Sequence, residues 1–341
     1  MADRIENYDI HEATTMGWHG KTEVRPLITL EDNYLRKWDL VPVPLYKRGE
    51  PSKYSILEVS DKVGLEIGKP YNPNTFQPIT TALFLELVKM SISGTQHKIV
   101  SVGSTRNRGR VFLSIELVGM DKFQAAGREF SAFLNFGNGH DKSSVLWVNT
   151  SNTCTVCDNT FSMNLFSVEN KAGKDEENGN GPADDISVRQ RHTKNATLKL
   201  PEIAKLVDKA VGVQGEFQIE FEKLSQVSVS LTDARDIFTG FLTRNSEADK
   251  LSTRTRNTVT TLETLFQSGR GNDGNDYSDM MSAVTDYYTH TSSRGNNPMR
   301  QVESSEYGAG LVAKQSFWEG IRNPEVINRW ATEGAELLAT V

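Results

Sequence analysis

One segment divides this chain of 341 residues into two parts with different hydrophobic patterns. Residues Glu169 to Asp185 combine acidic, glycine and asparagine residues with almost no apolar side chains. Burial of so few apolar groups cannot offset the entropy lost on ordering, so we expect a mobile loop over 169–185. Strand patterns dominate before this loop and helical patterns after it. The sequence therefore predicts a sheet-containing domain over 1–168 and a mainly helical region over 186–341, packed on the first.

Several segments before the loop have the pattern of strands. Leu40–Tyr46 alternates but contains two prolines, which cannot donate to a sheet ladder, so it fits an edge strand or an extended arm. The segments 54–59 and 63–67 predict a hairpin, and the apolar spacing after Pro78 predicts a helix. The remaining expected elements are strands at 110–118, 129–136 and 144–149, and a short helix that begins at Asp158 or Asn159.

The part after the loop has helical spacing throughout. The expected helices are 201–208, 232–242, 255–266, 277–288 and 325–338. A connection rich in glycine and asparagine, Ser268–Asp276, separates two of them. The sequence thus predicts an α+β fold, with a mixed or antiparallel sheet and helices in the N-terminal half and a mostly helical C-terminal half.

Composition limits the classes of function. The net charge of -6 argues against a protein that coats nucleic acid with its whole surface, but it allows a local basic patch. No apolar run approaches the roughly 20 residues that span a bilayer, and the N-terminus lacks the apolar core of an export signal. Two cysteines do not make a disulfide framework. We expect a cytoplasmic protein with no membrane segment.

The two cysteines, Cys154 and Cys157, have the spacing of half a zinc site or of a redox pair. A zinc site needs about four ligands, and no second close pair of Cys or His is present. The aromatic and proline surroundings of a thioredoxin-like motif are also missing. We expect both thiols to be reduced, metal-free and packed as small hydrophobes, and we expect no cofactor.

Basic and amide side chains gather on loops beside the predicted strands, where they can bind phosphate or bases. Each could instead be an ordinary solvated charge, and the loop 137–144 could be only a glycine-containing hairpin connection. The loop that carries His140 and Lys142 is expected to lie near the cluster 189–194. The candidate nucleic-acid-binding residues are Arg106, Arg108, Arg110, Arg128, His140, Lys142, Arg189, Arg191, His192, Lys194 and Arg270.

Aromatic residues accompany these basic groups on the predicted strands. They are Phe112, Phe133, Phe136 and Trp147. Basic groups with stacking aromatics suit single-stranded nucleic acid, although the same rings could be core. We assign no catalytic residue, because the His-Asp-Ser set within one loop is not a hydrolase triad, whose members converge from separate segments.

With these residues in view, the chain resembles the phage/plasmid-like protein family, also described as domain-of-unknown-function family 932. The matching motifs are Gly17–Gly20, Asn138–Ser144, Val156–Thr160, Arg191–Thr193, Leu265–Asn272 and Ala283–Tyr287, with departures at Lys142, Asp158 and Asp286. The resemblance implies an origin in a mobile element. It implies no activity, because the family is named for lacking an assigned one.

The order of three strands and a helix in the N-terminal half is similar to the core of phage single-strand annealing recombinases, an analogy at the level of fold. We expect a phage- or plasmid-encoded protein that binds or anneals single-stranded DNA in recombination or replication, as a homo-oligomer in the bacterial cytoplasm. The alternative is an accessory protein of a mobile element that binds a host enzyme. An enzyme is the third possibility, with Cys157 or His140 as its candidate residues.

Overall fold

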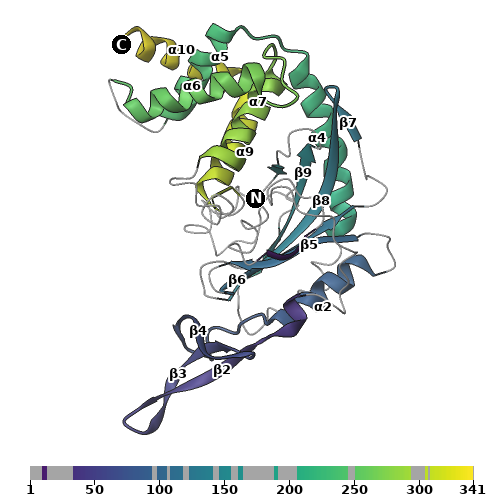
Figure 1. Ribbon diagram of the computed structural model, residues 1–341, viewed down its shortest axis with the longest axis vertical. Helices are drawn as coiled ribbons and strands as arrows, with labels where there is room; N and C mark the ends of the chain where they lie inside the picture. Colours follow the sequence, from purple (N-terminus) through teal and green to yellow (C-terminus); the bar gives the residue numbers. More distant parts are fainter. Residues whose placement is uncertain are drawn as a thin grey trace. The chain divides into compact units, whose positions relative to one another are not determined.

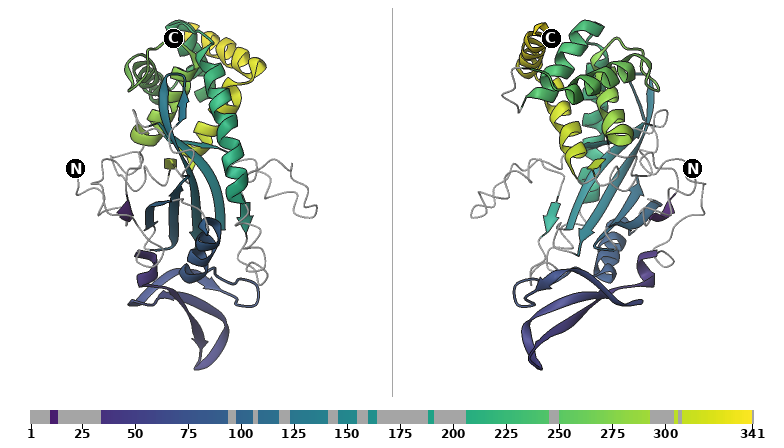
Figure 2. Two further views of the ribbon diagram at one scale, coloured as in Figure 1. Left: turned by 90° about the vertical axis from the view of Figure 1, so that its right-hand side faces the viewer. Right: turned by 60° about the vertical axis from the view of Figure 1, so that its left-hand side comes forward.

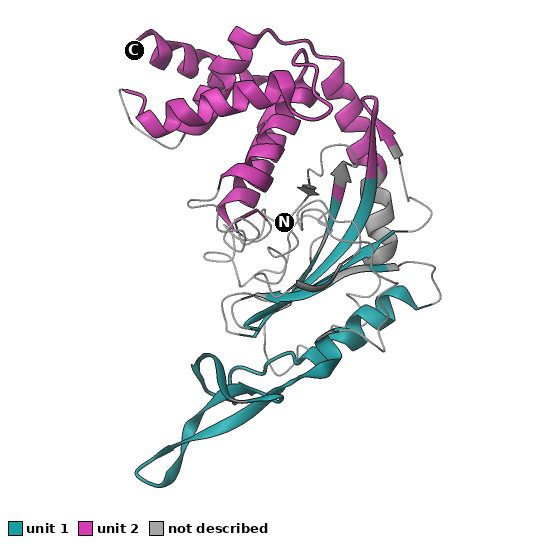
Figure 3. Cartoon of the chain, in the orientation of Figure 1, with its two compact units in different colours: residues 1–121, 131–151, 163–214 teal, residues 122–130, 152–162, 215–341 magenta. Residues whose placement is uncertain are grey.

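The computed structural model describes residues 10–13, 34–93, 98–105, 108–117, 123–140, 146–154, 160–163, 188–190, 206–244, 250–292, 304–305 and 308–340. The expected mobile loop, 169–185, lies outside them. The chain forms two compact units that interleave along the sequence (Figure 3). Unit 1 holds residues 1–121, 131–151 and 163–214, and unit 2 holds residues 122–130, 152–162 and 215–341. Because strands contribute to both units, this division differs from one made in sequence order.

Unit 1 contains a small antiparallel sheet in the order β2-β3-β4 (Figure 1). Its strands are β2 (Leu40–Lys47), β3 (Glu50–Val59) and β4 (Lys62–Tyr71). The expected hairpin is confirmed, and β2 lies at the sheet edge as its prolines predict. Arg48 and Gly49 join β2 to β3 with φ angles of 57° and 85°. Two residues at positive φ form a type I′ turn, which matches the twist of the flanking strands.

The larger sheet of unit 1 has the order β1-β5-β6-β8-β9, and β11 also pairs with β9. The strands are β1 (Ile10–Ala13), β5 (Lys98–Thr105), β6 (Arg110–Glu116), β8 (Arg128–Gly139), β9 (Leu146–Cys154) and β11 (Val188–Gln190). Consecutive residues of β6 are buried, so both faces of this strand are covered. The β-branched and aromatic residues of β6 and β8 therefore form a core, as their apolar runs predict.

Helix α2 (Thr81–Ile92) belongs to unit 1 and confirms the expected helix, although it begins three residues after Pro78 rather than with Pro78 in its first turn. The Thr80 side chain accepts from the backbone N–H of Leu83, and the Asp39 carboxylate accepts from that of Thr81 at 3.0 Å. Two donors of the first turn are thereby satisfied. Phe84 and Leu87 are fully buried, so one face of the helix joins the core. A short 3₁₀ helix, η2 (Tyr34–Lys37), precedes β2.

Unit 2 includes two short strands, β7 (Phe123–Ala125) and β10 (Thr160–Met163). Strand β7 pairs with the first residues of β8, and β10 pairs with β9. The helix expected to begin at Asp158 or Asn159 is therefore wrong, because residues 160–163 form a strand. Thr160 and Phe161 favour strands, and the ladder with β9 satisfies backbone groups that a short isolated helix would leave open.

The rest of unit 2 is helical, which confirms the mostly helical C-terminal half. Its elements are α4 (Leu206–Ser225, from residue 215), α5 (Leu231–Thr243), α6 (Thr253–Ser268), α7 (Tyr277–Asp286), the π-helical turn η4 (Tyr287–Thr291), α9 (Ala309–Ile321) and α10 (Pro324–Ala339). Ser, Asp or Asn side chains cap the starts of α5, α6, α7 and α10. Such caps satisfy the first backbone N–H groups, and they explain why these four helices are predictable from sequence. Helix α9 was not predicted, and α4 is much longer than the expected 201–208.

Aromatic side chains form the core of unit 2. Phe217 stacks on Phe221 at a centroid distance of 5.4 Å, and both contact Phe130 edge to face. A second group joins α5, α9 and α10, in which the Phe317 and Trp330 rings are stacked at 5.8 Å. Aromatic pairs of this kind add about 0.5–1.5 kcal/mol beyond their apolar burial. No helix among the described residues could cross a membrane.

Candidate nucleic-acid interface

Strand pairing brings several cationic segments of unit 1 to one end of its larger sheet. Arg110, at the start of β6, faces both Thr105 at the end of β5 and Gly139 at the end of β8. At the neighbouring strand, Gln190 at the end of β11 faces Leu146 at the start of β9. The strand ends that precede or follow the segments with Arg106, Lys142 and Arg191–Lys194 therefore lie together. We call this region the cationic sheet end.

The register of β11 bears on the expected closeness of the loop 137–144, which carries His140 and Lys142, and the cluster 189–194. The backbone of Arg189 pairs with that of Trp147, one residue after β9 begins. Strand β11, which carries Arg189, therefore lies beside β9, the strand that follows the loop with His140 and Lys142. Beyond these strands, Arg106, Lys142, Arg191, His192 and Lys194 lie outside the described residues, as does the side chain of Arg189.

Arg108 takes a structural role in unit 1. Its guanidinium lies 4.8 Å from the centroid of the Trp38 ring and forms an ion pair with Asp61 in the β3–β4 turn. Only 9% of the residue is exposed. The aromatic face and the carboxylate together hold the cation between the two sheets of unit 1. Arg108 therefore drops out of the candidate set for phosphate binding.

His140 is also buried, at 1% exposure, although the sequence places it on a polar loop. Its backbone N–H donates to the carbonyl of Gly109 at 2.7 Å, and its ring meets that of Trp38 edge to face. The neighbouring Asn138 is equally buried and donates through Nδ2 to the carbonyl of Ile79 at 2.7 Å. This motif thus ties the sheet to the start of α2, and His140 cannot present a donor to an anion at the surface.

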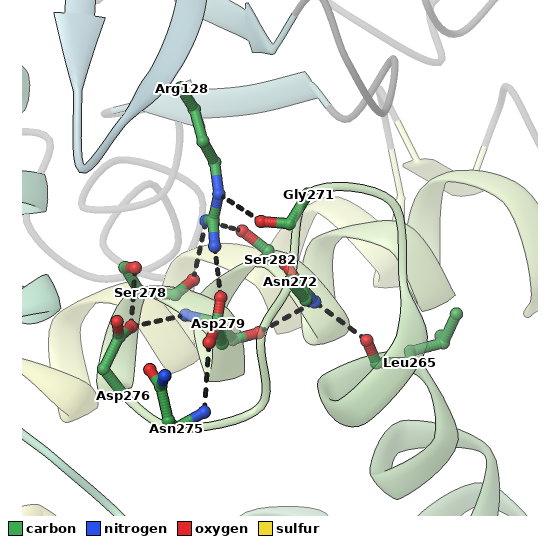
Figure 4. A network of polar contacts seen from close by, with 9 residues as sticks. All are labelled: Arg128, Leu265, Gly271, Asn272, Asn275, Asp276, Ser278, Asp279 and Ser282. Atoms are coloured by element: carbon green, nitrogen blue, oxygen red, sulfur yellow. Dashed lines mark hydrogen bonds and ion pairs between the residues drawn. The ribbon is translucent and has the colours of Figure 1, made fainter.

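Arg128 forms the centre of a polar network in unit 2 (Figure 4). Nε donates to the carbonyl of Gly271 at 2.8 Å, Nη1 donates to Ser282 Oγ at 2.6 Å, and Nη2 is paired with the Asp279 carboxylate. The arginine is 7% exposed and the aspartate 1%. All three guanidinium nitrogens are engaged by protein, so Arg128 is not available to a phosphate.

The glycine-rich connection between α6 and α7 supplies the other side of this network. Gly271 and Gly274 have φ angles of 76° and 72°, a conformation that favours glycine. Asn272 Nδ2 donates to the carbonyls of Leu265 and Asp279 at 2.8 and 3.3 Å. Hydrogen bonds therefore hold this loop in a defined conformation between the end of α6 and the start of α7. Arg270, at its tip, is exposed.

The Asp279 carboxyl experiences two opposing effects. Burial raises its pKa above the ordinary value, and the neighbouring Asp276 adds to that rise. The backbone N–H of Asn275 and the Arg128 guanidinium lower the pKa. Burial is the largest of these effects, which makes Arg128 the counter-charge on which the ionised form depends.

The aromatic residues expected to stack on bases are core residues. Phe112, Phe133, Phe136 and Trp147 are between 0% and 7% exposed. Trp147 lies so close to Gly137 on the adjacent strand that a Cβ there would come within 2.1 Å of the ring. The core alternative therefore holds for these four rings, and stacking groups must come from elsewhere.

A surface cleft of about 290 Å³ lies between η2 and the start of α2 and was not expected from the sequence. Among its lining residues are Arg36, Lys37, Asp39 and Glu86. Asp39 Oδ1 accepts from the backbone N–H of Leu40 and from both the N–H and hydroxyl of Thr81, at 2.8–3.0 Å. Three donors on one oxygen give this carboxylate a capping role at the start of α2.

The described residues contain no group of His, Cys, Asp and Glu side chains that could hold a metal ion. Cys154 ends β9, and Cys157 lies outside the described residues. The expectation of reduced, metal-free thiols therefore stays a prediction.

Residues 176–312 match the model of a protein family described as Domain of unknown function (DUF932). This segment is similar to the DUF932 family. The match agrees with the family that the sequence motifs indicate, and it includes both the glycine-rich connection and α7. Comparison with curated proteins gives no match, and comparison with solved structures gives none either.

The DUF932 segment also contains a tyrosine cluster at the π-helical turn η4. The Tyr287 hydroxyl lies 3.2 Å from Thr258 Oγ1, and its ring contacts that of Tyr288 at 5.0 Å. Burial raises the pKa of Tyr288 to about 12, with Tyr287 adding to the rise and Arg244 and Arg254 opposing it. The phenol is therefore neutral at physiological pH.

We expect this tyrosine to make the DUF932 segment lose stability at alkaline pH. Above pH 10 an unfolded tyrosine releases its proton, whereas folded Tyr288 keeps its proton until about pH 12. The folded state then binds more protons, so the free energy of unfolding falls by about 2 kcal/mol between pH 10 and 12. Chemical denaturation of the parent and Tyr288→Phe across this range measures the difference; equal pH slopes would contradict the assignment.

Proposed function

We propose that this chain binds single-stranded DNA through the cationic sheet end of unit 1. The observation that carries the proposal is the strand register, which places the end of β11 beside the start of β9. Residues 186–201 contain four cationic side chains and no acidic one, in a chain whose net charge is -6. A local concentration of positive charge of this kind attracts a phosphate backbone. The members of the set that remain in unit 1 are Arg106, Arg110, Lys142, Arg189, Arg191, His192 and Lys194, and Arg270 remains in unit 2.

Single strands suit this region better than duplex DNA. The described part of the cationic sheet end consists of strand termini and turns, whereas base readout in a duplex normally uses a helix or ribbon in the major groove. A flexible single strand needs only a charged path for its phosphates and rings on which its bases can stack. We also propose, from the family resemblance, that the protein comes from a phage or plasmid and acts in recombination or replication in the bacterial cytoplasm as a homo-oligomer.

The double variant Arg189→Ala/Arg191→Ala tests the site. We expect weaker binding to a single-stranded oligonucleotide and a shallower salt dependence, because each lost phosphate contact lowers the slope by about 0.7. Stability should change by no more than about 0.5 kcal/mol if both side chains are exposed. Fluorescence anisotropy titrations at several salt concentrations, with thermal unfolding in parallel, measure both quantities.

A matched control removes two exposed cations elsewhere, Lys89 on α2 and Arg329 on α10. The control Lys89→Ala/Arg329→Ala has the same change in net charge and should keep the parental slope. If the Arg189/Arg191 variant binds like the control, the cationic sheet end is not the DNA site. If the parent protein binds no single-stranded DNA even at low salt, the function itself is wrong, and the accessory protein that binds a host enzyme becomes the leading alternative.

A further inference from the structure

The β2–β3 hairpin of unit 1 exposes two aromatic rings beside its turn. We define the arm tip as residues 46–54, around the turn of this hairpin, which is drawn as a twisted two-stranded ribbon (Figures 1 and 2). Tyr46 is 65% exposed and Tyr54 is 42% exposed. Among the described residues, they are the only aromatic members of the exposed large hydrophobic set. The arm tip thus has the rings that the cationic sheet end lacks.

The arm tip is also positively charged. Lys47, Arg48 and Lys53 are exposed and are accompanied by one acidic residue, Glu50, which gives a net charge of +2. The Lys53 ammonium lies 5.3 Å from the centroid of the Tyr54 ring. Cations beside exposed aromatic rings are the combination that holds the phosphates and bases of a single strand.

The turn residue Arg48 has a conformation that its side chain does not favour. Its φ of 57° lies in the left-handed region, where asparagine or glycine is preferred at this position of a type I′ turn. An Asn-Gly pair would form the same turn with less strain. The sequence thus places a long cation at the apex of the hairpin against the local conformational preference, which points to a use for the charge.

The arm tip does not suit another protein chain equally well. The prolines of β2 at positions 42 and 44 lie two residues apart, so both fall on the same edge of the strand, and the opposite edge is paired with β3. Prolines on the free edge remove the N–H donors that strand addition requires. Residues 46–54 include no aliphatic side chain other than that of Pro51 and are mostly polar, unlike the apolar centre of a stable interface between copies of one chain. With these two kinds of protein contact disfavoured, the side chains of the arm tip are best suited to bind a negatively charged polymer such as nucleic acid.

We propose that the arm tip is a second contact for single-stranded nucleic acid, in which Tyr46 and Tyr54 stack on bases and the three cations bind phosphates. This inference rests on the proposed function, but it concerns residues remote in sequence from the cationic sheet end. The two sites can therefore fail separately.

Substitution of Tyr46 separates stacking from charge. We expect Tyr46→Ala to weaken binding to a single-stranded oligonucleotide about tenfold while the salt slope stays unchanged, because a stacked base contributes about 1–3 kcal/mol without releasing counterions. Tyr46→Phe keeps the ring and should bind like the parent. The control Ile219→Ala removes an apolar side chain of similar exposure, 57%, from α4 and should have no effect.

Substitution of Arg48 tests the charge without loss of the hairpin. Arg48→Asn suits the turn better than arginine, so the variant should fold at least as well, yet its salt slope should fall by about 0.7. Photocrosslinking to an oligonucleotide that contains 5-iododeoxyuridine, followed by peptide mapping, should recover a crosslink at Tyr46 or Tyr54.

The outcomes distinguish the inference from the proposed function. If Tyr46→Ala and Arg48→Asn bind like the parent and no crosslink maps to the arm tip, the inference is wrong, while loss in the Arg189/Arg191 variant would still uphold the cationic sheet end. If only the arm variants lose binding, the arm tip is the principal contact and the inference stands. A parent protein that binds no single strand overturns both.

Discussion

Replacing Arg128 by alanine should lower the free energy of unfolding by about 3–5 kcal/mol. The substitution leaves the Asp279 carboxylate, 1% exposed, without its counter-charge. It also removes the donors to the Gly271 carbonyl and to Ser282 Oγ, which tie the start of β8 to the glycine-rich connection and to α7. An uncompensated buried charge is among the few single changes with so large an effect. Chemical denaturation of the purified variant measures the loss.

Two further variants show whether the buried pair is the cause. Arg128→Ala/Asp279→Ala removes both charges and should be less destabilised than the sum of the two single variants, because the second substitution removes the uncompensated charge. Arg235→Ala breaks an exposed pair with Glu263 and should have an effect below about 1 kcal/mol. If Arg128→Ala proves no worse than Arg235→Ala and instead weakens DNA binding, Arg128 faces a ligand as the sequence predicted.

Arg128 also shows where prediction from the sequence ends. A lone arginine before a strand has the same local pattern whether it contacts solvent, phosphate or a buried acid. Its partner Asp279 is 151 residues away, so nothing in the neighbouring sequence reveals the pair. Arg108 and His140 follow the same rule, because each is buried by a contact with Trp38, from a segment about 70–100 residues earlier in the chain.

The elements themselves were more predictable, because their causes are local. Capping side chains and apolar spacing mark α5, α6, α7 and α10, and alternation marks β6 and β8. Helix α9 was not predicted, because its start has no capping side chain and its turn-like Gly308-Ala-Gly310 sequence favours a loop. The interleaving of the two units could not be predicted either, since it depends on pairings between distant strands.

The two proposed binding sites also differ in how far the sequence predicts them. The pairing of Arg189 with Trp147 agrees with the expected closeness of the loop 137–144 and the cluster 189–194 at the level of the strands. For Lys142 and residues 191–194, which lie outside the described residues, that closeness stays a prediction. The arm tip was foreseen only as an edge strand or extended arm. Its tyrosines became candidates once the structure showed that Phe112, Phe133, Phe136 and Trp147 are core. A ring on a strand can face either side, and burial decides between a core residue and a stacking residue.

A second large loss of stability is expected where α5 and α10 cross in unit 2. Gly334 of α10 lies against the backbone of α5, so that a Cβ would come within 1.9 Å of the Asp236 carbonyl oxygen. Gly240 of α5 lies equally close to α10, with a Cβ position 2.0 Å from the Trp330 carbonyl oxygen. The two helices are therefore in backbone contact at both glycines, and neither neighbour can rotate away as a side chain could.

We expect Gly334→Ala to lower the free energy of unfolding by about 3 kcal/mol. Alanine favours a helix over glycine by about 1 kcal/mol, but the methyl group must separate α5 from α10 and open the packing around Trp330. The matched control is Gly215→Ala in α4, where a Cβ meets nothing within 4 Å and the helical preference alone should raise stability by about 0.5–1 kcal/mol. Opposite signs for one substitution in two helices, measured by denaturation in the same buffer, would establish the close crossing. A Gly334→Ala protein as stable as the Gly215→Ala protein would show that the helices do not touch there.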